Sequence, residues 1–163
     1  MGRTVMGWWG YGIMEGDTPC DCRYDILRAA ADKDAVEALV GTGADEYDAM
    51  ESVGLQELQY PSVSLKMLQA IKQTSLCVYD TSIAVQVLAH MLMMEGYAML
   101  PEIKHDAIMV SKQMIADIDT EGWCDKEARI TALKSFIQCL NTYDGTPMTD
   151  TNKGLLETIL GGE

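Results

Sequence analysis

The chain has 163 residues, of which 48% are hydrophobic and 23% charged, and its formal net charge is −13. This length suits one domain with a substantial core, so we expect a single helical domain over residues 1–163. The charge argues against direct binding to nucleic acid, because few basic side chains are present to neutralise phosphates.

The composition favours helices over sheets. Methionine occurs 12 times and phenylalanine once. Methionine fills the irregular gaps between packed helices, whereas sheets favour β-branched and aromatic residues. No stretch alternates between apolar and polar residues as a half-buried strand does. We therefore predict an all-α fold, a compact bundle of about seven or eight helices around one buried helix.

The cysteines and the apolar runs of the sequence indicate the cellular compartment of the protein. The five cysteines include no C-x-x-C pair, which predicts reduced thiols and a cytoplasmic protein. The longest apolar run is shorter than the roughly 20 residues that span a bilayer. We therefore expect no membrane partner.

The N-terminal segment 1–16 is rich in glycine and tryptophan, which predicts an irregular segment folded onto the helices. A helix is expected from Thr18, as N-cap, to about Ala31. The sequence Met-Gly-Trp-Trp-Gly-Tyr-Gly at 6–12, followed by an acid, resembles the opening of a bacterial family catalogued as domain of unknown function 4259. The resemblance implies a small helical domain without an established activity, and it places the family motif at Trp9, Gly10, Gly12 and Asp17. This chain departs from the family pattern at Met14 and Gly16.

Further helices are predicted from the periodic spacing of apolar residues and from the glycines and prolines that end or begin helices. The central one contains Ile83–Met94, which is apolar on every side except at Gln86 and His90. We expect it to begin after a cap at Asp80 or Thr81 and to end at Pro101. The other predicted helices cover 34–41, about 45–58, 62–78, 101–118, 125–143 and 149–160.

Two pairs of residues have spacings that could serve a chemical site. Asp21 and Asp25 share one helix face, as carboxylates that hold a divalent cation would, but acids are also common at a helix start. Glu102 and His105 have the spacing of di-iron bundles, yet those need two such helices. We therefore predict no cofactor and no catalytic residue. A metal-dependent enzyme that uses these carboxylates, or Glu15 and Asp17, stays an alternative.

Seven acidic residues lie within one stretch of 20 residues, 32–51. This density favours a non-catalytic protein-binding module, such as an inhibitor, immunity or adaptor protein, that engages a basic partner surface. In a more specific form the carboxylates imitate nucleic-acid phosphates and bind a nucleic-acid-handling enzyme. A purely solubilising surface and a structural subunit of an oligomer are the alternatives, and the sequence sets neither the partner nor the oligomeric state. The predicted partner-binding residues are Asp32, Asp34, Glu37, Asp45, Glu46, Asp48 and Glu51.

Overall fold

The computed structural model of the chain describes residues 17–77 and 80–145. This part of the chain forms seven α-helices and one short 3-10 helix and contains no strand, which confirms the all-α prediction. The predicted irregular segment 1–16 and the predicted terminal helix 149–160 lie outside the described residues. The elements are α1 (Asp17–Ala30), α2 (Lys33–Gly41), α3 (Glu46–Glu57), α4 (Pro61–Lys72), α5 (Thr81–Glu95), α6 (Pro101–Ala116), η1 (Ile118–Thr120) and α7 (Lys126–Thr142).

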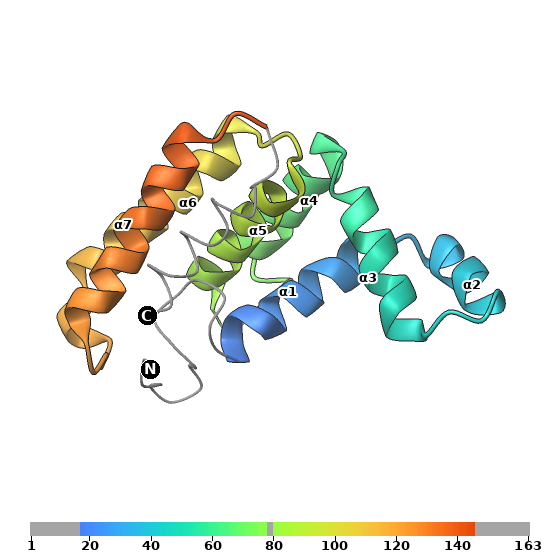
Figure 1. Cartoon of the computed structure of the whole chain (residues 1–163), viewed down its shortest axis with the longest axis horizontal. Helices are drawn as coiled ribbons and strands as arrows, with labels where there is room; N and C mark the ends of the chain where they lie inside the picture. The colour runs from blue at the N-terminus through green and yellow to red at the C-terminus, as the bar shows by residue number, and fades with distance from the viewer. Residues whose placement is uncertain (1–16, 78–79, 146–163) are drawn as a thin grey trace.

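Helix α5 is the centre of the bundle (Figure 1). Its residues from Ile83 to Ala89 and from Met91 to Met93 are all buried. Helices α1, α4 and α6 pack against α5, and α7 packs against α6. Because a helix that is apolar on every side needs neighbours around it, the sequence of α5 accounts for its position.

The two polar residues of the apolar run have different environments. Gln86 is buried and donates a hydrogen bond from Nε2 to Ser111 Oγ at 2.9 Å, and Ser111 donates to the carbonyl oxygen of Ala107 at 2.7 Å. Leaving a buried amide without a partner costs about 1–3 kcal/mol, so this chain of bonds favours one register of α6 on α5. His90, by contrast, is only half-buried.

The ends of α5 follow from local sequence. The side chain of Asp80 accepts a hydrogen bond from the Ile83 amide at 3.0 Å, which confirms the predicted cap. Gly96 adopts the left-handed conformation with φ 75° and ends the helix at Glu95. The expectation that α5 continues to Pro101 is therefore wrong, because glycine is a better helix terminator than the prediction allowed. Pro101 begins α6 instead.

Three other predicted boundaries are also corrected. Thr18 is not the cap of α1, because the helix already includes Asp17. Helix α4 begins at Pro61 rather than after Ser62, since proline suits the first position of a helix. It ends at Lys72 rather than 78, and the next turn contains Thr74 with a left-handed φ of 56°.

Hydrogen bonds of one tyrosine connect the end of α7 to the end of α5. The hydroxyl of Tyr143 donates a hydrogen bond to the carbonyl oxygen of Tyr97 at 2.6 Å and lies 3.1 Å from that of Leu92. Burial, and to a smaller extent the charge of Asp144, raises the pKa of Tyr143 to about 12. The neutral hydroxyl therefore joins two helix ends that are about 50 residues apart.

Candidate protein-binding surface

Helix α2 projects from the bundle at the end opposite α7 (Figure 1). It packs against α3, yet none of its residues is buried. The helix forms because Asp32 caps it, accepting a hydrogen bond from the Ala35 amide at 3.1 Å. It ends in a tight turn in which Gly43 has φ 104°, a conformation that favours glycine.

Helix α3 connects this projection to the bundle by close packing on α1. A Cβ atom on Gly54 would lie only 2.6 Å from the carbonyl oxygen of Leu27, so a side chain is excluded where the two helices cross. Next to this contact, Arg23 and Glu51 form an ion pair of 2.7 Å. The rings of Tyr24 and Tyr47 stack with centroids 5.8 Å apart and planes 2° from parallel.

The seven predicted partner-binding carboxylates fall into two groups. Three are engaged within the protein: Asp32 and Asp45 cap α2 and α3, and Glu51 is the half-buried partner of Arg23. The remaining four are exposed and form no ion pair with a described residue; they are Asp34, Glu37, Glu46 and Asp48. We call these four the free acidic group.

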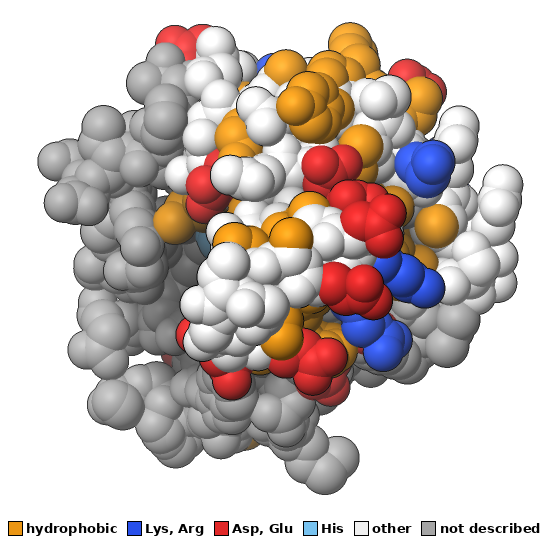
Figure 2. Space-filling model, turned by 90° about the vertical axis from the view of Figure 1, so that its right-hand side faces the viewer, with side chains coloured by type: hydrophobic (Ala, Val, Ile, Leu, Met, Phe, Trp, Pro, Cys, Tyr) orange, Lys and Arg blue, Asp and Glu red, His pale blue; other side chains and the backbone are white. Residues whose placement is uncertain are grey.

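Large hydrophobic side chains are exposed at the same end of the molecule. Within the described residues, six such side chains are exposed, and four of them belong to α1, α2 and α3. These four are Tyr24, Leu39, Val40 and Tyr47. Figure 2 looks onto this end and shows acidic and hydrophobic side chains next to one another.

The candidate metal ligands do not meet in a cluster. No group of three or more histidine, cysteine or acidic residues that would hold a metal ion exists within 17–77 and 80–145. Asp21 is exposed and Asp25 is half-buried on α1. Glu102 and His105 are both exposed on the first turns of α6. A charge-stabilising position in the first turn of α6 accounts for Glu102.

The cysteines form no disulfide in the described part of the chain. Cys22 and Cys77 are buried side by side, and the Cys77 thiol donates to the carbonyl oxygen of Cys22 at 3.7 Å. Hydrogen bonding to Cys22, followed by burial, raises the pKa of the Cys77 thiol. The raised pKa and the burial of Cys77 both disfavour its thiolate, which is the reactive form of cysteine.

A polar cluster that sequence reasoning missed lies at the turn between α6 and α7. The guanidinium of Arg129 is buried over the ring of Trp123, 4.6 Å from its centroid. Trp123 Nε1 donates to the Glu121 carboxylate at 2.9 Å. Burial lowers the pKa of Arg129 to about 10, and the charge of Glu121 opposes this shift.

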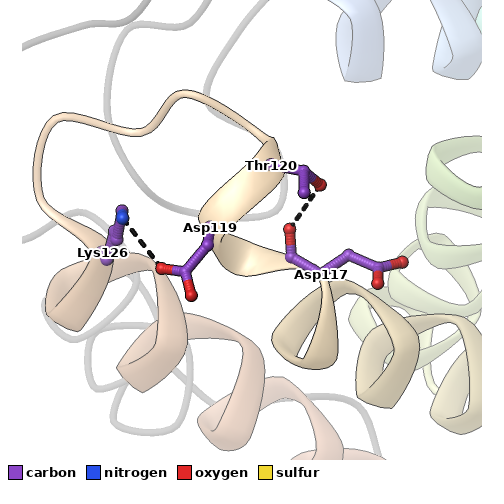
Figure 3. Close-up of polar contacts among 4 residues, drawn as sticks. All are labelled: Asp117, Asp119, Thr120 and Lys126. Carbon is purple, nitrogen blue, oxygen red and sulfur yellow. Dashed lines mark hydrogen bonds and ion pairs between the residues drawn. The ribbon is translucent and has the colours of Figure 1, made fainter.

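The same turn is closed by two exposed contacts (Figure 3). Lys126 pairs with Asp119 at 2.8 Å, and the Thr120 hydroxyl donates to the carbonyl oxygen of Asp117 at 2.8 Å.

The burial of Arg129 could have been predicted from its spacing in the sequence. Arg129 lies four residues before Leu133 and continues the buried stripe of α7, a position at which a charged residue is easily taken for an exposed one.

Comparisons with protein-family models, with curated proteins and with solved structures found no match. The resemblance to the domain of unknown function 4259 stays a prediction, and three residues of its motif, Trp9, Gly10 and Gly12, lie outside the described residues. Asp17, the fourth, begins α1. Among the described helices, none is both long and apolar enough to cross a membrane.

Proposed function

We propose that the protein is a non-catalytic binding module, an inhibitor, immunity or adaptor protein, whose α2–α3 end engages a basic surface of another protein. The observation that carries this proposal is the charge of residues 32–51, which contain seven acidic side chains and one basic one, Lys33. The free acidic group within this stretch has no ion-pair partner among the described residues, so its charge is available to a ligand.

Physical chemistry favours such a surface as a recognition site rather than as a source of stability. Exposed carboxylates contribute little to folding, but their summed field attracts a basic partner and raises its association rate. Helix α2 adds to this field, because its C-terminal turn contains no basic residue to offset the partial negative charge of the helix end.

The more specific form of the proposal is imitation of nucleic acid. In this form the free acidic group occupies the site where a nucleic-acid-handling enzyme binds phosphates. Asp32, Asp45 and Glu51 also serve the fold, as helix caps and as the partner of Arg23, so the test variants leave these three residues unchanged. This form predicts that DNA or RNA competes with the protein for the partner.

The test compares two triple variants with equal changes in charge. One is Glu37→Gln, Glu46→Gln and Asp48→Asn at the α2–α3 end. The control is Glu95→Gln, Glu102→Gln and Glu127→Gln, which are exposed on α5, α6 and α7. Each tagged protein is used to isolate partners from extracts of cells that make it, at about 50 and 200 mM salt.

We expect the wild type and the control variant to retain the same partner, and the α2–α3 variant to lose most of it. Affinity should fall steeply as salt rises, since the contact is electrostatic. Equal retention by both variants would exclude the α2–α3 end as the binding site. Binding that is indifferent to salt would exclude imitation of nucleic acid.

A further inference from the structure

The amphipathic helix α2 leaves part of its apolar face uncovered. Ala35 and Val36 are half-buried against the rest of the molecule, but Leu39 and Val40 on the next turn are 38% and 39% exposed. These four residues follow the spacing of one helix stripe. The apolar stripe is therefore half-buried at its N-terminal end and exposed to solvent at its C-terminal end.

The exposed end of the stripe is held in a fixed position. After Val40 the chain turns sharply, and the amides of Thr42 and Ala44 donate to the carbonyl oxygen of Leu39 at 3.0 and 3.2 Å. The Thr42 hydroxyl donates to the same oxygen at 2.7 Å. A site that is ordered before it binds loses little conformational entropy on association.

Acidic side chains flank these apolar residues on both sides along the chain. Asp34 and Glu37 precede Leu39 and Val40 on α2, and Glu46 and Asp48 follow them in the first turn of α3. The exposed ring of Tyr47 lies between the last two acids in sequence. This end of the molecule therefore carries both exposed apolar and acidic side chains, and Figure 2 shows them near one another, with basic side chains on one side of the face.

This combination identifies the chemistry of the occupant. A second copy of the chain would bring like charges together, at −13 for each copy. An anionic membrane or a nucleic acid would be repelled in the same way. A helix with one apolar stripe flanked by lysine and arginine satisfies both features, because the stripe covers Leu39 and Val40 while the basic residues meet the carboxylates.

We propose that the α2–α3 end binds a basic amphipathic helix of the partner protein. This inference rests on the proposed function and specifies the partner element that the surface recognises. The apolar contact supplies affinity that salt does not screen, and the charges supply orientation and association rate.

The test uses two synthetic peptides of identical leucine and lysine composition. In one, the leucines follow helical spacing so that they form a single stripe; in the other, the order is scrambled. Binding to the full chain is measured by fluorescence anisotropy, and peptide helicity by circular dichroism. We expect the patterned peptide to bind at least about tenfold more tightly than the scrambled one and to gain helicity on mixing.

Paired variants separate the apolar contribution from the charge. Leu39→Ser with Val40→Ser should weaken binding of the patterned peptide by about tenfold, since its apolar contact is lost. The control, Tyr60→Ser with Met109→Ser, removes the two large exposed hydrophobic side chains that the described residues contain outside α1, α2 and α3, and it should change affinity less than about twofold.

Equal binding of the patterned and scrambled peptides would overturn the helix proposal, as would an unchanged affinity after substitution of Leu39 and Val40. Neither result would affect the proposed function, which the isolation of partners with the charge variants tests separately. Loss of natural-partner binding in the Leu39 and Val40 variant, with the Tyr60 and Met109 control unaffected, would support the helix proposal in the full complex.

Discussion

At the scale of single residues, Gly54 shows how one absent side chain positions the candidate surface. Its sequence context in α3 is that of an ordinary helix residue, where glycine costs about 1 kcal/mol relative to alanine. The structure gives the reason for accepting this cost, because the backbone of Leu27 occupies the space that a Cβ atom would need. Alanine at this site has to move α3 away from α1.

We therefore predict that Gly54→Ala destabilises the protein by about 1–3 kcal/mol, the usual range for forcing extra atoms into a packed contact. Gly41→Ala is the matched control, since a Cβ atom there would meet nothing within 4 Å. The control should be neutral or slightly stabilising, because alanine favours the helix. Urea unfolding measures both. Equal stability of the two variants would contradict the close crossing of α1 and α3.

Tyr143 gives a prediction that depends on pH. Its pKa lies at about 12 in the folded chain, above the ordinary value of 10, because burial favours the neutral hydroxyl. A group whose pKa is raised by folding contributes stability below the unfolded pKa and loses it as pH rises through the folded pKa. The contribution of Tyr143 is therefore complete below pH 10 and declines toward pH 12.

We expect Tyr143→Phe to lower the free energy of unfolding by about 1 kcal/mol near neutral pH, because one hydrogen bond is lost. The difference from wild type should shrink as pH rises above about 10. Tyr60→Phe, which alters an exposed tyrosine, is the control and should have little effect. A difference that stays constant up to about pH 12 would contradict the hydrogen-bonded role of the hydroxyl.

At the scale of elements, α2 and α5 differ most in how much of each helix is buried. Helix α5 has ten buried residues, whereas α2 has none. Opening α2 therefore exposes little new apolar surface, and its amides should exchange with solvent faster than those of α5.

Proline substitutions test this division. Ala38→Pro breaks the exposed interior of α2 and should leave the melting temperature of the bundle nearly unchanged while binding is lost. Ala89→Pro breaks α5 at a fully buried position and should prevent folding. Hydrogen exchange and thermal melting are the measurements. A large loss of stability in Ala38→Pro would show that α2 belongs to the cooperative core.

Helix positions follow from local sequence more reliably than helix ends do. The all-apolar run of α5 identified the central helix, and Asp80 identified its start. The end of α5 was misplaced because Gly96 and Pro101 are both helix-terminating residues, and which one acts depends on whether residues 97–100 find tertiary contacts. Tyr97 receives the hydrogen bond of Tyr143, a long-range contact that periodicity does not reveal.

At the scale of the whole molecule, the acidic stretch could be located from the sequence. Which of its carboxylates take part in the fold, and which are exposed without an ion-pair partner, could not. Seven carboxylates look equivalent in the printed sequence, yet Asp45 caps a helix and Glu51 pairs with Arg23, 28 residues earlier. Reversing the charge of these two would damage the fold as well as the surface. The exposure of Leu39 and Val40 could not be predicted either. The sequence of α2 is that of an ordinary short amphipathic helix, and only the structure shows that none of its residues is buried.

The net charge predicts how salt acts on the fold as a whole. At −13 the carboxylates repel one another, and about 200 mM salt shortens the range of this repulsion to roughly one side-chain length. Salt also weakens ion pairs, but the described part of the chain contains three, all partly or fully exposed and each worth about 0–1 kcal/mol. Repulsion should dominate.

We therefore expect the melting temperature to rise between about 10 and 200 mM sodium chloride, by roughly 2–4 °C for each kcal/mol of relieved repulsion. The variant with Glu37→Gln, Glu46→Gln and Asp48→Asn should show a smaller rise than wild type, since it removes three charges from the densest acidic stretch. The control with Glu95, Glu102 and Glu127 neutralised removes the same number of charges from dispersed sites and should stay closer to wild type. A melting temperature that falls with salt would mean that the three ion pairs outweigh the repulsion, and that the acidic end is less concentrated in space than in sequence.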